Sequence, residues 1–90
     1  MPVEFDPTKD AANIKKHGVS LAEGDGVLND PLALTIEDEA ADGEQRFISI
    51  GANVFGALMV VVHTPRGGGT RIISVRKPDP KERRCYEEGL

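Results

Sequence analysis

Three arginines recur at five-residue intervals in the C-terminal half of the sequence, at Arg66, Arg71 and Arg76. A guanidinium presents its N–H donors in a planar fork that matches phosphate oxygens, and it is costly to bury without an anion. Arginines that stand between β-branched residues of a strand therefore predict an anion opposite them. A phosphate ligand is one candidate for that anion, and an acid from residues 38–44 is the alternative.

The strand predicted over residues 71–77 decides where two of these arginines point. Because their spacing is odd, strict alternation puts Arg71 and Arg76 on opposite faces, with Ser74 on the face of Arg76. Arg76 also comes just before a predicted helix start at Asp79, where unpaired backbone N–H groups favour a phosphate. Arg76 is therefore the sharpest candidate for phosphate binding.

The two histidines are candidates for proton transfer, because an imidazole titrates near neutral pH. His17 follows Lys16 at a predicted helix end, where the alternative interpretation is that it complements the helix dipole. His63 ends an apolar strand, where the alternative is a core residue with a satisfied hydrogen bond. Pairing of His63 with Ile72 in the predicted hairpin puts His63 on the face of Arg76, and a slip of one residue separates them. Two histidines without a neighbouring cysteine predict no metal site.

The glycine run Gly67–Gly69 has the composition of a phosphate-cradling loop. It lacks the Lys-Ser/Thr pair that completes such a loop, and it precedes a strand rather than a helix. The run therefore predicts a flexible hairpin turn. Cys85 is interpreted as a small packing residue, and Tyr86 as either a core residue or a platform for a base.

Capping signals predict three helices, over residues 7–17, about 21–28 and about 80–88. The first helix begins with an Asp-Pro pair and ends at Gly18, after basic residues that suit the negative end of the helix dipole. Ser20 and Glu23 predict a capping box for the second helix. Asp79 and Glu82 predict another for the third.

Short runs of apolar and β-branched residues predict strands over residues 3–5, 32–37, 45–50, 57–64 and 71–77. The connections over 51–56 and 65–69 are of hairpin length and can join only antiparallel strands. The strand over 57–64 is apolar on both faces and should be central. The order β-α-α-β-β-β-β-α predicts a single α+β domain over residues 1–90. We expect a small antiparallel twisted sheet with its helices on one face and nothing on the other.

The composition indicates one small globular domain, with 39% hydrophobic and 29% charged residues in a chain of 90. The net charge of −4 hides an uneven distribution, because residues 20–45 carry eight acids and no Lys or Arg, whereas residues 46–90 carry eight bases against four acids. A basic C-terminal half can meet an anion despite the acidic total, and two solvated faces of opposite sign are the alternative. A single cysteine, short apolar runs and a start without a signal-peptide pattern lead us to expect a cytoplasmic protein.

Six blocks of sequence carry a resemblance to a known family. The blocks are Glu4-Phe5-Asp6-Pro7, Lys16-His17-Gly18-Val19-Ser20, Asp30-Pro31, Glu44-Gln45-Arg46-Phe47-Ile48, Val60-Val61-Val62-His63-Thr64 and Arg71-Ile72-Ile73-Ser74-Val75-Arg76-Lys77. In this order and spacing they resemble the BrnT-type toxins over nearly the whole chain. The sequence departs from the family pattern at His63, where Tyr is more usual, at Val75, where Ala is, and at Pro78, where a small residue is.

The resemblance implies the fold of RelE-like ribonucleases and the role of toxin in a type II toxin–antitoxin pair that inhibits translation. The implied partner is a BrnA-type antitoxin with a ribbon-helix-helix domain, which would connect the toxin to operator DNA only indirectly. The implied reaction is RNA cleavage without a metal or other cofactor. In it the 2′-hydroxyl attacks the adjacent phosphorus and leaves a 2′,3′-cyclic phosphate.

Such a reaction needs a base, an acid and cations that stabilise the phosphorane. We assign Arg66 and Arg76 as phosphate stabilisers. Lys16 or His17 is assigned as base or acid, with His63 as the alternative. The residues expected to contact the rest of the RNA are Arg46, Arg71, Lys77 and Arg83. The competing hypothesis is a catalytically silent module that binds only an antitoxin-like partner.

Overall fold

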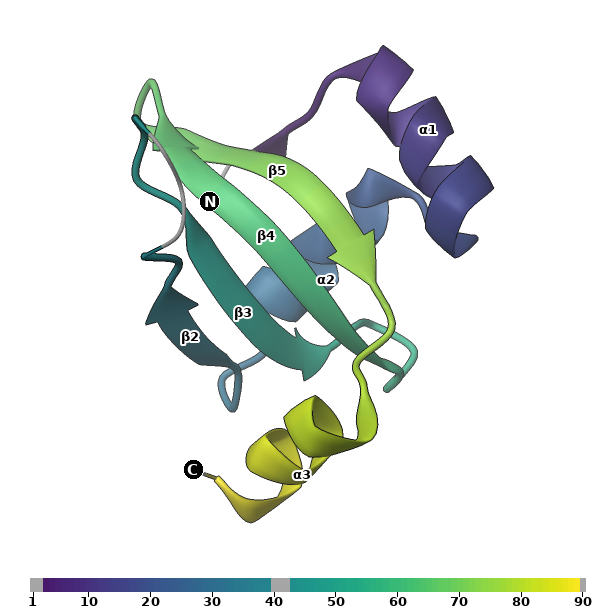
Figure 1. Ribbon diagram of the computed structural model, residues 1–90, viewed down its shortest axis with the longest axis vertical. Coiled ribbons are helices and arrows are strands. Elements are labelled where there is room, and N and C mark those ends of the chain that lie inside the picture. The colour runs from purple at the N-terminus through teal and green to yellow at the C-terminus, as the bar shows by residue number, and fades with distance from the viewer. Residues whose placement is uncertain (1–2, 40–42, 90) are drawn as a thin grey trace.

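A five-stranded sheet in the order β1–β5–β4–β3–β2 forms the frame of the protein, and the computed structural model describes residues 3–39 and 43–89 (Figure 1). The strands are β1 (Val3–Glu4), β2 (Leu34–Glu37), β3 (Phe47–Ala52), β4 (Leu58–Arg66) and β5 (Gly69–Arg76). The helices are α1 (Pro7–His17), a 3-10 turn η1 (Leu21–Glu23), α2 (Gly24–Leu28) and α3 (Pro80–Glu88). The predicted order of elements is confirmed, with η1 and α2 in the place of the second helix. The central position predicted for the strand over 57–64 is also confirmed, because β4 lies in the middle of the sheet.

The expectation of a wholly antiparallel sheet is wrong, because β1 pairs with β5 in the parallel direction. The other three pairs of neighbours are antiparallel. The short connections of β3 to β4 and of β4 to β5 require this direction. The chain between β1 and β5 contains α1, η1, α2 and three strands. A connection of this length allows β1 to run either parallel or antiparallel to β5. The sheet is therefore mixed, with one short parallel strand at its edge.

Local capping fixes the helix ends much as the sequence predicts. Asp6 caps α1 by accepting a hydrogen bond from the backbone N–H of Thr8 at 2.8 Å, and Gly18 closes it at φ 74°. Asp79 and Glu82 form the predicted capping box of α3. The box predicted at Ser20 does not form: Ser20 Oγ caps η1 by accepting from the backbone N–H of Ala22, and the Glu23 carboxylate accepts from Asn53 Nδ2 at 3.0 Å.

The hydrophobic core lies between the sheet and the helices α1, η1 and α2. Leu21 and Val27 from these helices meet Val61 and Ile72 from the sheet, and all four are at most 2% exposed. Helix α2 approaches the sheet closely at Gly24, where an added Cβ atom would lie 2.8 Å from Ile72 Cδ1. We call this side the helix-covered face.

The third helix overturns the expectation that all helices share one face. Figure 1 shows α3 at the end of the sheet, away from α1 and α2. A groove of about 390 Å³ separates α3 from the other side of β2 and β3, and it is lined there by Leu34, Ile36, Ile48 and Ile50. These residues alternate with those facing the core, so they need a cover of their own. We call this side of the sheet the opposite face. None of the described residues of α3 is buried.

A β-bulge in β5 changes which side chains share a face. Val62 pairs with Ser74 and His63 pairs with Ile72, so Ile73 is an extra residue without a partner on β4. The bulge shifts the alternation by one residue on the hairpin side of Ile73. Ile72 therefore points into the core, and Arg71 points to the opposite face.

No helix in the described ranges is both long enough and apolar enough to cross a bilayer.

Candidate functional site

Arg66, Arg71 and Arg76 lie on the opposite face of the β4–β5 hairpin, and we call them the arginine row. Arg71 pairs with Thr64 and Arg76 pairs with Val60, while Arg66 lies two residues beyond Thr64 on the same strand. Paired residues of neighbouring strands point to the same side of a sheet, and so do residues two apart on one strand. The prediction that Arg71 and Arg76 point to opposite faces is therefore wrong, because it assumed a strand without a bulge.

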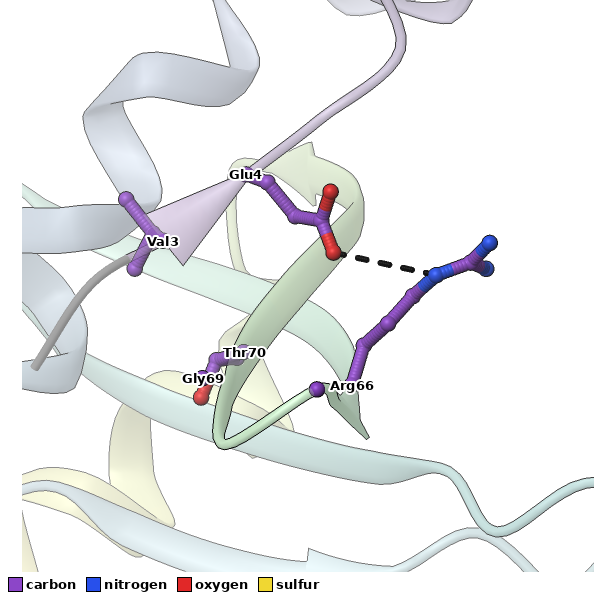
Figure 2. Close-up of a pocket in the computed structure, with 6 residues that line it drawn as sticks. Val3, Glu4, Arg66, Gly69 and Thr70 are labelled. Atoms are coloured by element: carbon purple, nitrogen blue, oxygen red, sulfur yellow. Dashed lines mark ion pairs between the residues drawn. The ribbon is translucent and has the colours of Figure 1, made fainter.

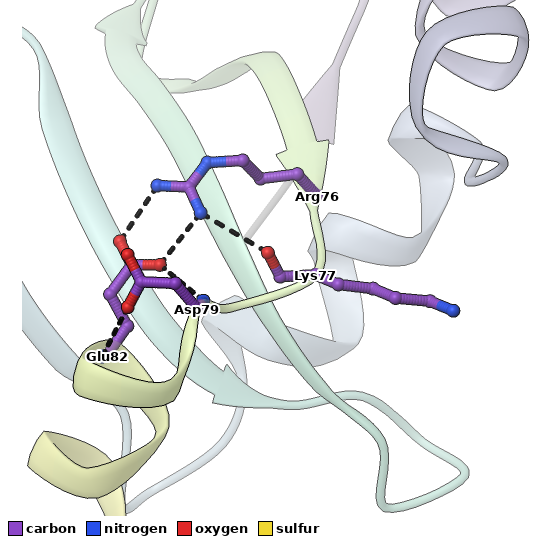
Figure 3. Close-up of polar contacts among 4 residues, drawn as sticks. All are labelled: Arg76, Lys77, Asp79 and Glu82. Carbon is purple, nitrogen blue, oxygen red and sulfur yellow. Dashed lines mark hydrogen bonds and ion pairs between the residues drawn. The ribbon is translucent and has the colours of Figure 1, made fainter.

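Arg76 forms a two-pronged ion pair with Glu82 at the start of α3 (Figure 3). Both guanidinium–carboxylate distances are 2.8 Å, and Nη1 also donates to the carbonyl of Lys77 at 3.2 Å. The hydrogen bond from Arg76 lowers the pKa of Glu82, and the hydrogen bond to Glu82 raises the pKa of Arg76. The arginine thus has an acid opposite it, but that acid comes from α3 and not from residues 38–44. Residues 40–42 of that segment lie outside the described residues.

The other two arginines of the row are less firmly held. Arg66 Nε lies 3.7 Å from Glu4 Oε1, and both side chains are more than half exposed (Figure 2). The Nε atom of Arg71 is buried and has no hydrogen-bond partner among the described residues. A guanidinium in these surroundings retains donors for an incoming anion. The hairpin end of the row is therefore the end best suited to bind phosphate.

His63 lies on the helix-covered face, away from the side chain of Arg76. The predicted pairing with Ile72 is present, but the bulge beyond it puts Arg76 on the other side. Nε2 of His63 lies 2.8 Å from Ser49 Oγ, which in turn lies 2.7 Å from Thr35 Oγ1. Burial lowers the pKa of His63. The lowered pKa favours the uncharged imidazole. The grouping of His63 with Arg76 on one face is wrong, because the bulge separates them.

A hollow of about 500 Å³ opens where the β4–β5 hairpin turns, and we call it the hairpin hollow. Its turn is the predicted one, since Gly67 and Gly68 adopt φ values of 55° and 82° that few other residues tolerate. The rings of Phe47 and His63 stack in it with their centroids 5.9 Å apart. The lining residues are Phe47, His63, Pro65, Arg66, Gly67, Gly68, Gly69 and Thr70. Arg66 therefore belongs both to the hollow and to the arginine row.

Lys16 and His17 line a separate groove of about 290 Å³ between α1 and β5, together with Lys9 and Ser74. Asn13 joins the two elements, because its Nδ2 donates to the carbonyls of Val19 and Val75 at 2.8 Å each. The backbone N–H of Val75 donates back to Asn13 Oδ1 at 3.3 Å. The amide thus occupies the free edge of β5 as a neighbouring strand would, and it holds the basic end of α1 beside the sheet.

The four residues predicted to contact RNA outside the catalytic set are spread over the surface. Arg46 forms an exposed ion pair with Glu44 at 3.1 Å. Lys77 and Arg83 are exposed, the first after β5 and the second on α3, while Arg71 belongs to the arginine row. The predicted catalytic residues lie in three places, which are the arginine row, the hairpin hollow and the α1–β5 groove. Arg46, Lys77 and Arg83 lie outside all three.

Sequence reasoning gave no site role to Lys9, Phe47, Ser49 or Glu82. Lys9 is seven residues before Lys16, which is two turns of a helix, so its place on the same helix face was readable from spacing. The contacts of Phe47, Ser49 and Glu82 carried no such signal, because they depend on the pairing of strands and on where α3 lies. In the described ranges, no group of three or more His, Cys, Asp or Glu side chains is arranged to hold a metal ion.

Among solved structures, the protein resembles the 1.1 Å crystal structure of the ribonuclease toxin BrnT from Brucella abortus. The two chains are 26% identical with a TM-score of 0.69, over 88% of this chain and 97% of that one. The fold is therefore that of a ribonuclease toxin.

The family model described as the ribonuclease toxin BrnT of type II toxin–antitoxin systems matches residues 5–82. The chain belongs to this BrnT family. A comparison with curated proteins found no significant match. The relation to RelE-like ribonucleases stays a prediction.

Proposed function

We propose that the protein is the toxin of a type II toxin–antitoxin pair and inhibits translation by cleaving RNA, with the arginine row as its phosphate-binding surface. The observation that carries the proposal is the placement of Arg66, Arg71 and Arg76 on one face of a single hairpin. Arginine matches phosphate oxygens with two donors at once, and a row of such groups along a strand suits a chain of phosphates. The family membership supplies the class of reaction.

The proposed reaction is attack of the RNA's own 2′-hydroxyl on the adjacent phosphorus, without a metal. The base takes the proton of the 2′-hydroxyl, the P–O5′ bond breaks, and the acid protonates the leaving 5′-oxygen. It needs cations for the charge that grows on the phosphorane, which Arg66 and Arg71 supply with the donors they retain. Arg76 joins them when a phosphate competes successfully with Glu82. Lys16 or His17 is the proposed base or acid, because both line the groove that Ser74 of β5 also lines. His63 is the alternative.

The proposed partner is a BrnA-like antitoxin with a ribbon-helix-helix domain. Its acidic side chains would pair with the arginine row, and its apolar ones would cover exposed residues of the opposite face such as Ile36, which is 65% exposed. Protection of Arg66 and Arg71 from a guanidine-reactive probe in the complex tests this placement. Unchanged modification rates would put the antitoxin elsewhere.

A second function is favoured by the Arg76–Glu82 pair. An arginine that is already bound to an acid on its own chain behaves as a structural residue, which suits a catalytically silent module that engages only a partner. Expression of the protein without an antitoxin separates the two functions. A toxin arrests growth of the host, whereas a silent module does not.

The direct test of the proposed reaction is incubation of the purified protein with RNA in excess EDTA. We expect cleavage products that end in a 2′,3′-cyclic phosphate. Cleavage that requires added metal, or no cleavage even with translating ribosomes, would contradict the mechanism.

Arg76 offers a sharper test, because its structural and catalytic roles predict different measurements. In the catalytic role, Arg76→Lys lowers the cleavage rate by roughly 100- to 1000-fold, as expected when one preorganised donor is lost. In the structural role, Arg76→Lys and Glu82→Gln lower the melting temperature alike and leave the activity of the folded fraction near normal. Arg84→Lys is the matched control, since Arg84 is exposed on the same helix as Glu82.

A further inference from the structure

The hairpin hollow contains an aromatic platform that the proposed reaction does not need. The reaction needs cations and proton carriers, whereas the hollow adds the ring of Phe47, stacked on His63, beside a turn of glycines. Phe47 and His63 are both only partly buried, so their rings remain within reach of a ligand. The volume of about 500 Å³ falls in the range of roughly 300–1,000 Å³ that is usual for small-ligand pockets.

The two rings are held in place from behind. His63 contacts Phe47 at 5.9 Å between centroids and at an angle of 27° between planes, and its Nε2 is engaged by Ser49. Ser49 is 1% exposed, and Thr35 engages it from the next strand. The hydrogen bonds that link Thr35 of β2, Ser49 of β3 and His63 of β4 fix the orientation of the His63 ring. The platform is therefore preorganised before any ligand arrives.

The chemistry of this platform favours a base over a phosphate. Burial lowers the pKa of His63, so the ring carries no charge that would attract an anion at pH 7. Nδ1 is the ring nitrogen that no described residue engages. Nδ1 donates a hydrogen bond in one tautomer of His63 and accepts one in the other, and the contact of Nε2 with Ser49 decides which tautomer is present. A nucleobase is a flat group with a hydrogen-bonding edge. It can stack on the aromatic ring of Phe47 and form a hydrogen bond with Nδ1 of His63.

We propose that the hairpin hollow binds one unpaired nucleobase of a single-stranded RNA, stacked against Phe47 and hydrogen-bonded by His63. The proposal rests on the proposed ribonuclease function and adds to it the place where the base is read. Arg66 connects the two, because it lines the hollow and also begins the arginine row. A nucleotide whose base enters the hollow would thus present its phosphate to Arg66. The glycine turn adds no side chain to the rim of the hollow.

The test uses two fluorescein-labelled RNA pentanucleotides with 2′-O-methyl groups throughout, which removes the attacking hydroxyl. One carries all five bases, and the other has an abasic central position. We expect the wild-type protein to bind the first about tenfold more tightly than the second, as the stacking of one base predicts. Phe47→Leu should abolish this difference and leave the affinity for the abasic probe unchanged.

Phe55→Leu is the matched control for the loss of a ring. Phe55 is 83% exposed in the connection at the other end of β3 and β4, so its replacement should leave both affinities unchanged. His63→Asn should reduce the preference for some bases over others in a set of probes that differ at the central base. A similar loss with Phe55→Leu, or an unchanged base preference with His63→Asn, would overturn the proposal.

A measurement on the wild-type protein keeps the proposal open to refutation if Phe47→Leu does not fold. The backbone amide signals of Gly67, Gly68 and Gly69 should shift on addition of the complete probe and much less with the abasic one. Equal shifts would contradict base binding.

The results distinguish a failure of the base-site proposal from a failure of the proposed ribonuclease function. Wild-type protein that cleaves RNA and binds both probes equally contradicts the base site and leaves the ribonuclease function standing. Protein that neither cleaves RNA nor binds either probe contradicts both.

Discussion

The two faces of the sheet differ in what their side chains contact. On the helix-covered face, Val61, Ile72 and Val75 are at most 2% exposed and belong to the apolar core. On the opposite face, Ile36 is 65% exposed and three arginines stand along one hairpin. The exception is Val60, which is fully buried beside Arg76. Strand alternation thus separates the residues that stabilise the protein from those that remain available to a ligand, although both come from the same strands.

The largest expected effect tests whether stability resides on the helix-covered face. Leu21→Ala should lower the free energy of unfolding by about 2–5 kcal/mol, because it leaves a cavity in a fully buried position. Ile36→Thr, which keeps a β-branched side chain on the opposite face, should change it by no more than about 0.5 kcal/mol. Urea titration of both variants measures the contrast. Equal losses would show that the opposite face also carries stability.

A smaller effect is expected where the helix-covered side meets the edge of the sheet. Asn13→Ala should lower the free energy of unfolding by about 2–3 kcal/mol. It leaves the carbonyl and the N–H of Val75 without the hydrogen bonds that the Asn13 amide makes to them. Asn29→Ala removes an amide that bonds only exposed groups of Asp25, so it should cost well under that. Hydrogen exchange of the Val75 amide would locate the loss. An unprotected Val75 in the wild type would contradict the role given to Asn13.

The smallest expected effect concerns α3, which is attached to the rest of the protein by polar contacts. Tyr86 donates a hydrogen bond to Asp30 Oδ2 at 2.6 Å, and the pKa of Asp30 is lowered by the N–H of Ala52, by this hydroxyl and by the N–H of Leu32. Tyr86→Phe should lower stability at pH 7 by less than about 1 kcal/mol, because the pair is close to solvent.

The pH dependence of that loss follows from the direction of the shift. A lowered folded-state pKa gives stability that is present above the ordinary value of 3.8 and lost as the pH falls through the folded value. The melting temperatures of wild type and Tyr86→Phe should therefore converge as the pH falls below 3.8 and the Asp30 carboxylate takes up its proton. A difference that grows on acidification would show that the hydroxyl does not act through the Asp30 carboxylate.

The features that the sequence predicted are those set by neighbouring residues. Asp6 and Gly18 bound α1 by side-chain and backbone geometry within a few residues, and Gly67 and Gly68 select their turn in the same way. The expectation of BrnT family membership drew on short blocks of sequence in the same way, and the match over residues 5–82 confirms it. Each of these signals is complete within a short stretch of chain, so it survives without knowledge of the fold.

The features that the sequence did not predict depend on contacts between distant residues. Ile72 and Ile73 are alike in size and shape, so nothing local marks one of them as the extra residue of a bulge. The side on which α3 packs follows from Tyr86 meeting Asp30 and Glu82 meeting Arg76, and neither pair has a sequence signature. The division of the candidate site into three places follows directly from these two features.

The bulge at Ile73 also bears on how related chains should be compared. Arg71 and Arg76 are an odd number of residues apart, and only the extra residue brings them into phase on one side of the strand. A relative that lacks the insertion would need an even interval to present the same row, so an alignment without a gap would match its arginine with a residue that faces the core. Comparing such chains by sheet face rather than by residue count would therefore recover arginine pairs that a search at fixed intervals overlooks.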